Sequence, residues 1–183
     1  IQEALPAATN KVTSPQKKLS IKIKGVKDLK ILDNTEVHEI IMPLIPQLVG
    51  AVTKDKRIKK QVSRITWDIQ PNIYQGEWKE FNTVIQQLIQ KGFDSFRLNN
   101  LSHFRFFSRN QASTLTGGPL LYSLNSLALL AYKELGVSAC TISPEDDKEN
   151  MALLATRETG VDVIIPVFSP VALVTSRIPM RLK

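Results

Sequence analysis

The chain has one cysteine, Cys140, and two histidines in 183 residues. A single cysteine cannot form an internal disulfide or supply a cysteine-rich metal site, so disulfide scaffolds and zinc-finger classes are excluded. The sequence also has no HExxH motif, no Ser-His-Asp order, and no close cluster of histidine, cysteine and carboxylate residues. We therefore expect no metal and no cofactor, and an intracellular, cytoplasmic protein.

Long apolar runs are also missing. No stretch reaches the about 18 consecutive apolar residues that indicate a membrane-spanning helix, and no signal-peptide pattern opens the chain. Hydrophobic residues still make up 43% of the composition, which is typical of a globular domain. We expect a folded domain with no membrane partner.

Positive charge exceeds negative charge, with 24 basic and 17 acidic residues and a net charge of +7. This balance is compatible with nucleic-acid binding, and equally with a solvated, lysine-rich surface. No aromatic residues alternate with the lysines, which argues against a groove that stacks single-stranded bases. Much of the excess lies in two early groups: Lys17, Lys18, Lys22, Lys24, Lys27 and Lys30, then Lys54, Lys56, Arg57, Lys59 and Lys60.

The length limits the architecture. A complete eight-stranded α/β barrel usually needs about 250 residues, so the chain is either a smaller α/β sheet or a barrel with pieces missing. Its first residue is Ile1 and not methionine, which suggests a fragment of a longer protein. Residues 1–18, rich in Ala, Thr, Pro and Ser, are expected to be a linker or tail, and residues 19–183 a single α/β domain.

Strand and helix patterns alternate along the chain. The clearest units are strands 94–99, 119–125 and 138–143, followed by helices 100–110, 126–135 and 144–157. Earlier strands are predicted at 19–24, 37–44 and 63–70, with helical segments at 26–32, 46–60 and 77–91, and later strands at 161–167 and 170–176. Such alternation predicts a parallel sheet with right-handed crossovers, and seven or eight strands favour a closed or nearly closed (β/α) barrel of the TIM type.

The alternation within strands predicts which side chains point into the barrel. Apolar residues must face the surrounding helices, which leaves Asp68, Arg97, Asn99 and Asn125 on the inside. An unpaired charge there is costly. Arg97 is therefore expected to pair with Asp68 or Glu39.

Polar clusters follow three of the predicted strands, where parallel barrels carry their chemistry. In the first, Asn99 and Asn100 precede His103, which could act as an acid or base or could be incidental to a capped helix. In the second, Asn125 could point into the barrel mouth while Ser126 caps the next helix.

The third cluster is Ser143-Pro144-Glu145. Proline at the first helical position after a serine cap has a purely structural explanation. Glu145 is nevertheless the best-placed carboxylate for chemistry. The 116–119 segment is expected to be a turn and not a phosphate loop, because it does not open a helix, and Cys140 is expected to face the helices.

These clusters resemble the collagenase-like peptidase family, known as family U-thirty-two, and in particular the C-terminal barrel portion of its longer members. The resemblance covers roughly residues 20–180. It rests on short motifs in a shared order: Leu98-Asn99-Asn100-Leu101-Ser102-His103, Asn125-Ser126-Leu127-Ala128, Ile142-Ser143-Pro144-Glu145 and Val174-Thr175-Ser176-Arg177.

The resemblance implies an α/β barrel and a peptidase (hydrolase) acting on a peptide substrate. Glu145 and His103 are the catalytic candidates, and the substrate-binding candidates are Asn99, Asn100, Asn125, Ser143 and Arg177. Several members of the family hydroxylate RNA or quinones and carry an iron–sulfur cluster on four cysteines. Here Ile178-Pro179 stand where the family has a cysteine, so no cluster is expected.

Two functions therefore remain open. The chain could be a peptidase domain, or a non-catalytic barrel portion that docks structured RNA or supports the catalytic domain of an RNA-modifying relative within a longer parent chain. A phosphate-binding metabolic enzyme is a third, weaker reading, because no Gly-rich loop follows the last strands.

Overall fold

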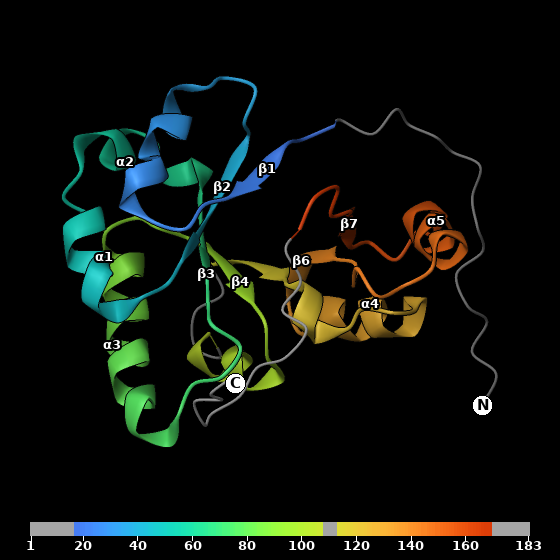
Figure 1. Cartoon of the computed structure of the whole chain (residues 1–183). Coiled ribbons are helices and arrows are strands. Elements are labelled where there is room, and N and C mark those ends of the chain that lie inside the picture. Colours follow the sequence, from blue (N-terminus) through green and yellow to red (C-terminus); the bar gives the residue numbers. More distant parts are fainter. Residues whose placement is uncertain (1–16, 108–112, 170–183) are drawn as a thin grey trace, which may run out of the picture.

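A computed structural model describes residues 17–107 and 113–169. It contains one sheet in which seven strands lie side by side in chain order, and every neighbouring pair is parallel. The sheet curls into half a barrel (Figure 1), which confirms the predicted α/β class with an incomplete parallel barrel. The strands are β1 (Ser20–Lys22), β2 (Glu39–Pro43), β3 (Ile65–Asp68), β4 (Ser95–Leu98), β5 (Thr114–Gly117), β6 (Val137–Thr141) and β7 (Asp162–Ile164).

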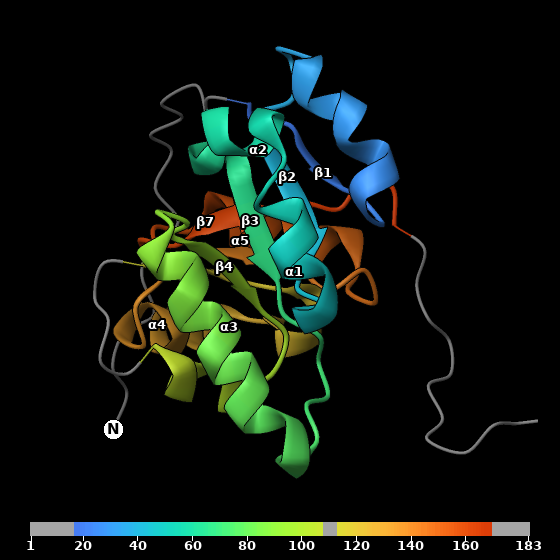
Figure 2. The same cartoon turned by 90° about the vertical axis from the view of Figure 1, so that its left-hand side faces the viewer.

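Helices connect the strands and cover the outer face of the sheet (Figures 1 and 2). The α-helices are α1 (Pro46–Val52), α2 (Lys56–Lys60), α3 (Trp78–Gln90), α4 (Ser126–Glu134) and α5 (Lys148–Thr156). Short 3₁₀ helices complete the connections: η1 (Val26–Asp33), η2 (Val62–Arg64), η3 (Gln75–Glu77), η4 (Leu101–Phe106) and η5 (Pro119–Leu121).

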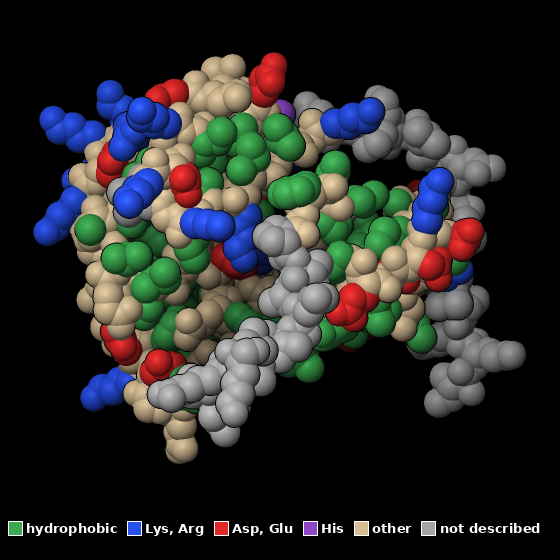
Figure 3. Space-filling view, in the orientation of Figure 1, with side chains coloured by type: hydrophobic (Ala, Val, Ile, Leu, Met, Phe, Trp, Pro, Cys, Tyr) green, Lys and Arg blue, Asp and Glu red, His purple; other side chains and the backbone are tan. Residues whose placement is uncertain are grey.

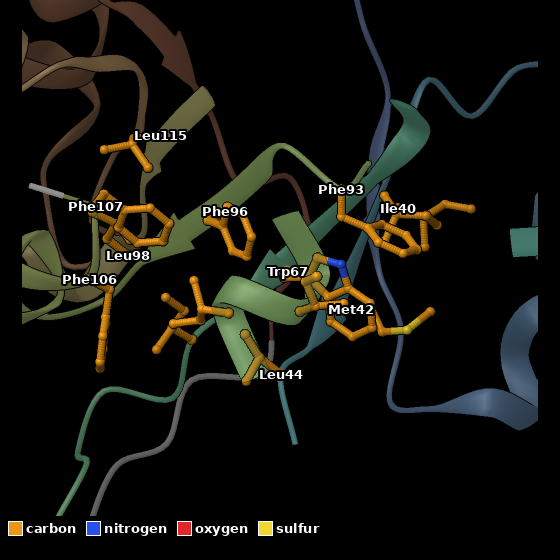
Figure 4. Packing of buried hydrophobic residues seen from close by; sticks show 14 of the residues in the cluster. Ile40, Met42, Leu44, Trp67, Phe93, Phe96, Leu98, Phe106, Phe107 and Leu115 are labelled. Carbon is orange, nitrogen blue, oxygen red and sulfur yellow. The ribbon is translucent and has the colours of Figure 1, made fainter. Parts of the chain in front are cut away.

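The outer face of the sheet is apolar and packs against this helical layer. Trp67 of β3 and Phe96 of β4 are register partners on neighbouring strands, and both are fully buried. The Trp67 ring meets Phe93 edge-on at 5.5 Å, and Phe96 lies 4.9 Å from Phe107 (Figure 4). These aromatic side chains bury large apolar areas, so the outer face supplies most of the core.

Helix α3 follows its sequence pattern closely. Phe81, Ile85 and Leu88 recur at helical spacing and are buried against the sheet. The helix ends where Gly92 adopts a left-handed conformation, with φ of +87°, which glycine takes at little cost.

One predicted strand is wrong. Residues 119–125 form the 3₁₀ turn η5 and a loop, and the strand lies earlier, at Thr114–Gly117, where it overlaps the first half of the 116–119 segment expected to be a turn. Apolar residues at 120–124 imitate a strand, but Pro119 starts a tight turn and Tyr122 is left-handed, with φ of 52°. Gly117 fits in the strand because a side chain there would meet the Cys140 sulfur of β6 at 2.7 Å.

Two predicted helices also differ from the structure. The segment 46–60 is divided into α1 and α2, because the Asp55 side chain accepts a hydrogen bond from the Arg57 backbone and starts a new helix. Helix α5 begins at Lys148 after an Asp147 cap, and not at Pro144. The predicted strand 170–176 lies outside the described residues, as does most of the 1–18 linker.

Candidate functional site

The inner face of the half-barrel is polar, as the strand pattern predicts. Its polar side chains form two groups, which we call the lower and the upper layer. In the lower layer, the hydroxyl groups of Ser20 and Thr66 both donate hydrogen bonds to the Glu39 carboxylate. The upper layer contains the register partners Asp68, Arg97 and Thr116, together with Lys22 and Thr141, whose side chains reach Asp68 and Arg97 from β1 and β6.

Asp68 is the centre of the upper layer. Its Oδ2 lies 2.6 Å from Lys22 Nζ, and its Oδ1 accepts a 2.8 Å hydrogen bond from Asn99 Nδ2. Arg97 Nε lies 3.9 Å from the same Oδ1, which confirms the predicted pairing of Arg97 with Asp68. The buried carboxylate is therefore contacted by two cations and one amide.

Arg97 reaches across the inner face. Its Nη2 donates a 3.2 Å hydrogen bond to Thr141 Oγ1 on β6, two strands away from β4. Burial lowers the pKa of the Arg97 guanidinium, and the negative charges of Asp68 and Glu39 oppose that shift. Arg97 Nε is buried and has no hydrogen-bond partner within residues 17–107 and 113–169.

Asn99 joins the inner face to the turn that follows β4. Its Nδ2 also donates to the Ile69 carbonyl at 2.8 Å, and its backbone N–H donates to His103 Nδ1 at 3.3 Å. Asn99 also lies close to Gly118, which directly follows β5. A Cβ atom at position 118 would lie 1.9 Å from Asn99 Oδ1. Asn99 therefore links the ends of β3, β4 and β5.

His103 lies in η4, next to the mouth, as predicted, but its side chain is fully buried. Burial lowers its pKa to about 4, partly offset by the charge of Asp68, so the imidazole is neutral at pH 7. Because Nδ1 accepts from Asn99, the proton of the neutral ring is on Nε2, which has no hydrogen-bond partner among the described residues. In this structure His103 holds the Asn99 backbone and does not face solvent.

Asn100 is the N-cap of η4. Its Oδ1 accepts from the Ser102 backbone at 2.9 Å and from the Ser102 hydroxyl at 2.8 Å. Asn99 and Asn100 together form one wall of a pocket of about 260 Å³, which we call the mouth pocket. Its other lining residues are apolar or aromatic: Leu101, Leu120, Leu121, Tyr122 and Tyr132.

The walls of the mouth pocket are fixed by a hydrogen bond, and its rim is apolar. Tyr132 donates a 2.6 Å hydrogen bond to the Leu121 carbonyl, which joins α4 to η5. Tyr122 is left-handed, which costs a non-glycine residue about 1–2 kcal/mol, and such strain often marks functional sites. Leu101, Leu120 and Tyr122 are 61%, 44% and 49% exposed, so large apolar groups border the pocket.

The other predicted site residues lie apart from the mouth pocket lining. Asn125 caps α4 by accepting from the Ala128 backbone, so it, and not Ser126, is the cap. Ser143 is buried after β6 and accepts a 3.3 Å hydrogen bond from the Glu145 backbone, whereas Glu145 itself is exposed. No described contact joins Glu145 to His103, and Arg177 lies outside the described residues.

A second pocket, of about 580 Å³, lies between η3, α3 and η4, and the sequence did not indicate it. The Trp78 and Phe106 rings stack at 4.5 Å, and the Arg105 guanidinium lies 5.7 Å from the Trp78 ring. Gln75 and Asn82 complete the lining. The inner-face role of Lys22 was also missed, although the alternation of β1 places it on the side opposite Ile21.

Residues 17–107 and 113–169 contain no group of three His, Cys, Asp or Glu side chains able to hold a metal ion. Cys140 is buried on the helix-facing side, as predicted, and burial raises the pKa of its thiol. None of the described helices has the length and apolar character needed to cross a membrane.

Comparison of the chain with protein-family models, with curated proteins and with solved structures finds no match. The geometry of the half-barrel and the short sequence motifs are therefore the basis for any assignment of function.

Proposed function

We propose that the chain is a barrel portion of a collagenase-like peptidase that binds a peptide at its mouth pocket and takes part in its hydrolysis. The observation that carries this proposal is the mouth pocket at the carboxyl ends of β4 and β5. The motif residues Asn99 and Asn100 form its wall, and in parallel barrels this end of the sheet carries the substrate site. The resemblance of the motifs at 98–103, 125–128 and 142–145 supplies the reaction class.

The pocket suits one side chain of an extended peptide. Its volume of about 260 Å³ is below the roughly 300–1,000 Å³ of sites that enclose drug-sized ligands. Its apolar walls favour a large aliphatic or aromatic side chain. The Oδ1 of Asn100 is used by Ser102, so its Nδ2 is the group that can donate to a peptide carbonyl.

Glu145 is the proposed base that activates water for attack on the peptide carbonyl. It is exposed in the turn after β6, where a substrate can reach it. His103 is neutral and enclosed, so in this proposal it is a positioning residue that orients Asn99 and the pocket wall.

Cleavage of gelatin and of dye-labelled collagen peptides tests the catalytic assignment. We expect Glu145→Gln to lower the rate by about 100-fold or more, because general acid–base catalysis contributes that much. The matched control is Glu149→Gln, an exposed glutamate in the first turn of α5, which should keep the wild-type rate. Equal rates for wild type and Glu145→Gln, or no cleavage by the wild-type chain, would contradict the catalytic role of Glu145.

A variant of the mouth pocket tests where the peptide binds. Leu120→Asp places a charge on the apolar rim and should raise KM for peptides with large apolar residues. Leu135→Asp is the control, because Leu135 is similarly exposed, at 51%, but does not line the pocket. Equal KM values in the two variants would place substrate binding elsewhere.

A second candidate function, docking of structured RNA, is favoured by the basic end of the molecule. Lysines of α2 and η1 are exposed, and these two helices pack together. Figure 3 shows Lys and Arg side chains gathered over this part of the molecule. The exposed lysines are Lys24, Lys27, Lys30, Lys54, Lys56, Lys59 and Lys60.

Salt dependence tests this alternative. Each phosphate neutralised by a lysine contributes roughly 0.7–0.9 to the slope of log K against log salt. The double variant Lys59→Gln/Lys60→Gln should therefore reduce that slope by about 1–2, whereas Leu135→Asp should not. RNA binding that does not depend on salt would exclude the candidate.

In either function a cytoplasmic location is part of the proposal, supported by the unpaired Cys140.

A further inference from the structure

The upper layer of the inner face carries more positive than negative charge. Lys22 and Arg97 both approach Asp68, which is the only carboxylate they contact directly within residues 17–107 and 113–169. Glu39, the next acidic group, belongs to the lower layer and is held by two hydroxyl groups. The three charged side chains of the upper layer have one positive charge in excess, which the nearby negative charge of Glu39 partly offsets.

Arg97 has hydrogen-bonding capacity that its neighbours do not use. A guanidinium has five N–H donors in a planar fork. Nη2 donates to Thr141, but Nε lies 3.9 Å from Asp68 Oδ1, beyond hydrogen-bond distance, and it has no other partner in the described ranges. A buried, unsatisfied donor on a charged group is costly, and it is commonly explained by a ligand, ion or water that completes its contacts.

The position of the guanidinium suits a ligand on the inner face. Arg97 contacts Asp68 on β3 and Thr141 on β6, so its side chain extends along the inner face across β5. The β5 residue in register with it, Thr116, is small. Figure 3 shows Lys or Arg and Asp or Glu side chains together near the middle of one face of the molecule.

Lys22 provides a second cation that can move. Its side chain is 60% exposed, whereas that of Asp68 is 7% exposed. An exposed ion pair of this kind contributes little, so the ammonium can shift from Asp68 Oδ2 towards a bound anion at small cost. Asn99 continues to hold Oδ1 of Asp68 when that happens.

We propose that Arg97 and Lys22 form a binding site for the carboxylate group of a small ligand or peptide on the inner face of the half-barrel. A carboxylate matches the planar fork of arginine in shape and charge. A phosphate group carries about 1.5–2 negative charges at neutral pH, so a carboxylate brings less repulsion from Asp68 and Glu39. The site does not depend on the proposed peptidase activity, because binding here needs neither Glu145 nor the mouth pocket.

Titration calorimetry with one pair of peptides tests the site. The probes are an acetylated tripeptide with a free C-terminal carboxylate, the same peptide as a C-terminal amide, and inorganic phosphate. We expect the acid to bind about tenfold or more tightly than the amide, because hydrogen bonds to charged groups have that value. Phosphate should not displace the acid.

Two variants and one control locate the binding. Arg97→Lys removes the fork and should weaken binding of the acid by about tenfold or more, and Lys22→Gln should weaken it roughly two- to fivefold. Lys27→Gln changes an exposed lysine of η1 and should leave binding unchanged. Because Arg97→Lys could also disturb the fold, the Arg97 Nε–H signal of the wild-type protein is followed by NMR, and it should shift on addition of the acid but not of the amide.

The opposite results overturn the proposal. Equal affinity for acid and amide, no binding of the acid, or an Nε–H signal that does not respond would mean that the donor is satisfied by water or left unsatisfied. Competition by phosphate would reassign the site to phosphate ligands. Loss of binding in Lys27→Gln equal to that in Lys22→Gln would indicate a nonspecific effect of surface charge. Each of these outcomes is measured without peptide cleavage, so failure of the peptidase proposal does not affect the test.

Discussion

The two faces of the same sheet are built on different principles. On β4, Phe96 faces outward and is fully buried among aromatic and aliphatic neighbours, whereas Arg97, the next residue, faces inward into a network of charges and hydrogen bonds. Outward packing is non-directional and contributes stability in proportion to buried area. The inner network contributes less net stability, because desolvation offsets charge pairing, but it holds polar groups in defined positions. The difference indicates that the outer face stabilises the half-barrel and the inner face is available for function.

The largest expected effect separates the two faces within one strand. Phe96→Ala should lower the free energy of unfolding by about 3–5 kcal/mol, because it leaves a cavity in the core. Ser95→Ala, one residue earlier, should change it by less than about 0.5 kcal/mol, since Ser95 is only half-buried and its hydroxyl makes one long hydrogen bond, to Asp94. Urea denaturation of both variants measures the two values. Similar losses would mean that the inner face is packed as a second core.

The next largest expected effect is a dependence of the free energy of unfolding on pH, which arises from His103. Its pKa is about 4 in the folded protein against an ordinary value of 6.5, so the unfolded chain binds the proton more readily between these values. The stability from the neutral imidazole is complete above about pH 6.5 and is lost as pH falls towards 4, by roughly 2–3 kcal/mol in all. Urea denaturation across this pH range measures the loss.

Two histidine variants identify the source of that dependence. His103→Asn keeps an acceptor near the position of Nδ1 for the Asn99 N–H and removes the titrating ring. The free energy of unfolding of this variant should therefore change little between pH 6.5 and 4. His38→Asn is the comparison variant, because it changes the other histidine, which is exposed and accepts a hydrogen bond from the Leu19 backbone. A decline that persists in His103→Asn would assign it to other groups.

Two glycines test how closely the inner network is joined at the mouth. Gly118→Ala would place a methyl group 1.9 Å from Asn99 Oδ1 and should destabilise the protein by about 1–3 kcal/mol. Gly50→Ala in α1 meets nothing within 4 Å and should stabilise the protein by about 0.5–1 kcal/mol. Thermal melting distinguishes these opposite signs. A neutral Gly118→Ala would show that Asn99 can leave the mouth pocket wall without loss.

The sequence predicts most of the architecture because local patterns carry it. Alternation in β3 and β4 identifies Trp67 and Phe96 as outward and Asp68 and Arg97 as inward, and the pairing of Arg97 follows from the cost of burying its charge alone. The strand at Thr114–Gly117 is not predictable in the same way, because its glycine is selected by the approach of Cys140 from another strand. That contact is long-range and leaves no periodic signal.

The candidate site is less predictable than the fold. The motifs identify Asn99 and Asn100, which do line one pocket, but local sequence cannot show that His103 is enclosed or that Asn125 is used by its own helix. Those outcomes depend on how the ends of neighbouring strands meet. The sequence also did not predict that Leu120 and Tyr122 line the mouth pocket, because the pattern of their segment resembles that of a strand.

The smallest expected effect tests whether the polar inner face is a network or only a filling of the half-barrel. Thr141→Val removes the hydroxyl that accepts from Arg97 Nη2 while keeping the volume of the side chain, and it should destabilise the protein by about 1–2 kcal/mol. Thr116→Val changes the neighbouring inner threonine, also buried, and should alter stability by less than about 0.5 kcal/mol. Urea denaturation at pH 7 compares the two variants. A larger loss at 141 would show that the inner face is held by specific hydrogen bonds to Arg97, whereas equal values would mean that its threonines act only through their volume and that the guanidinium is fixed by Asp68 alone.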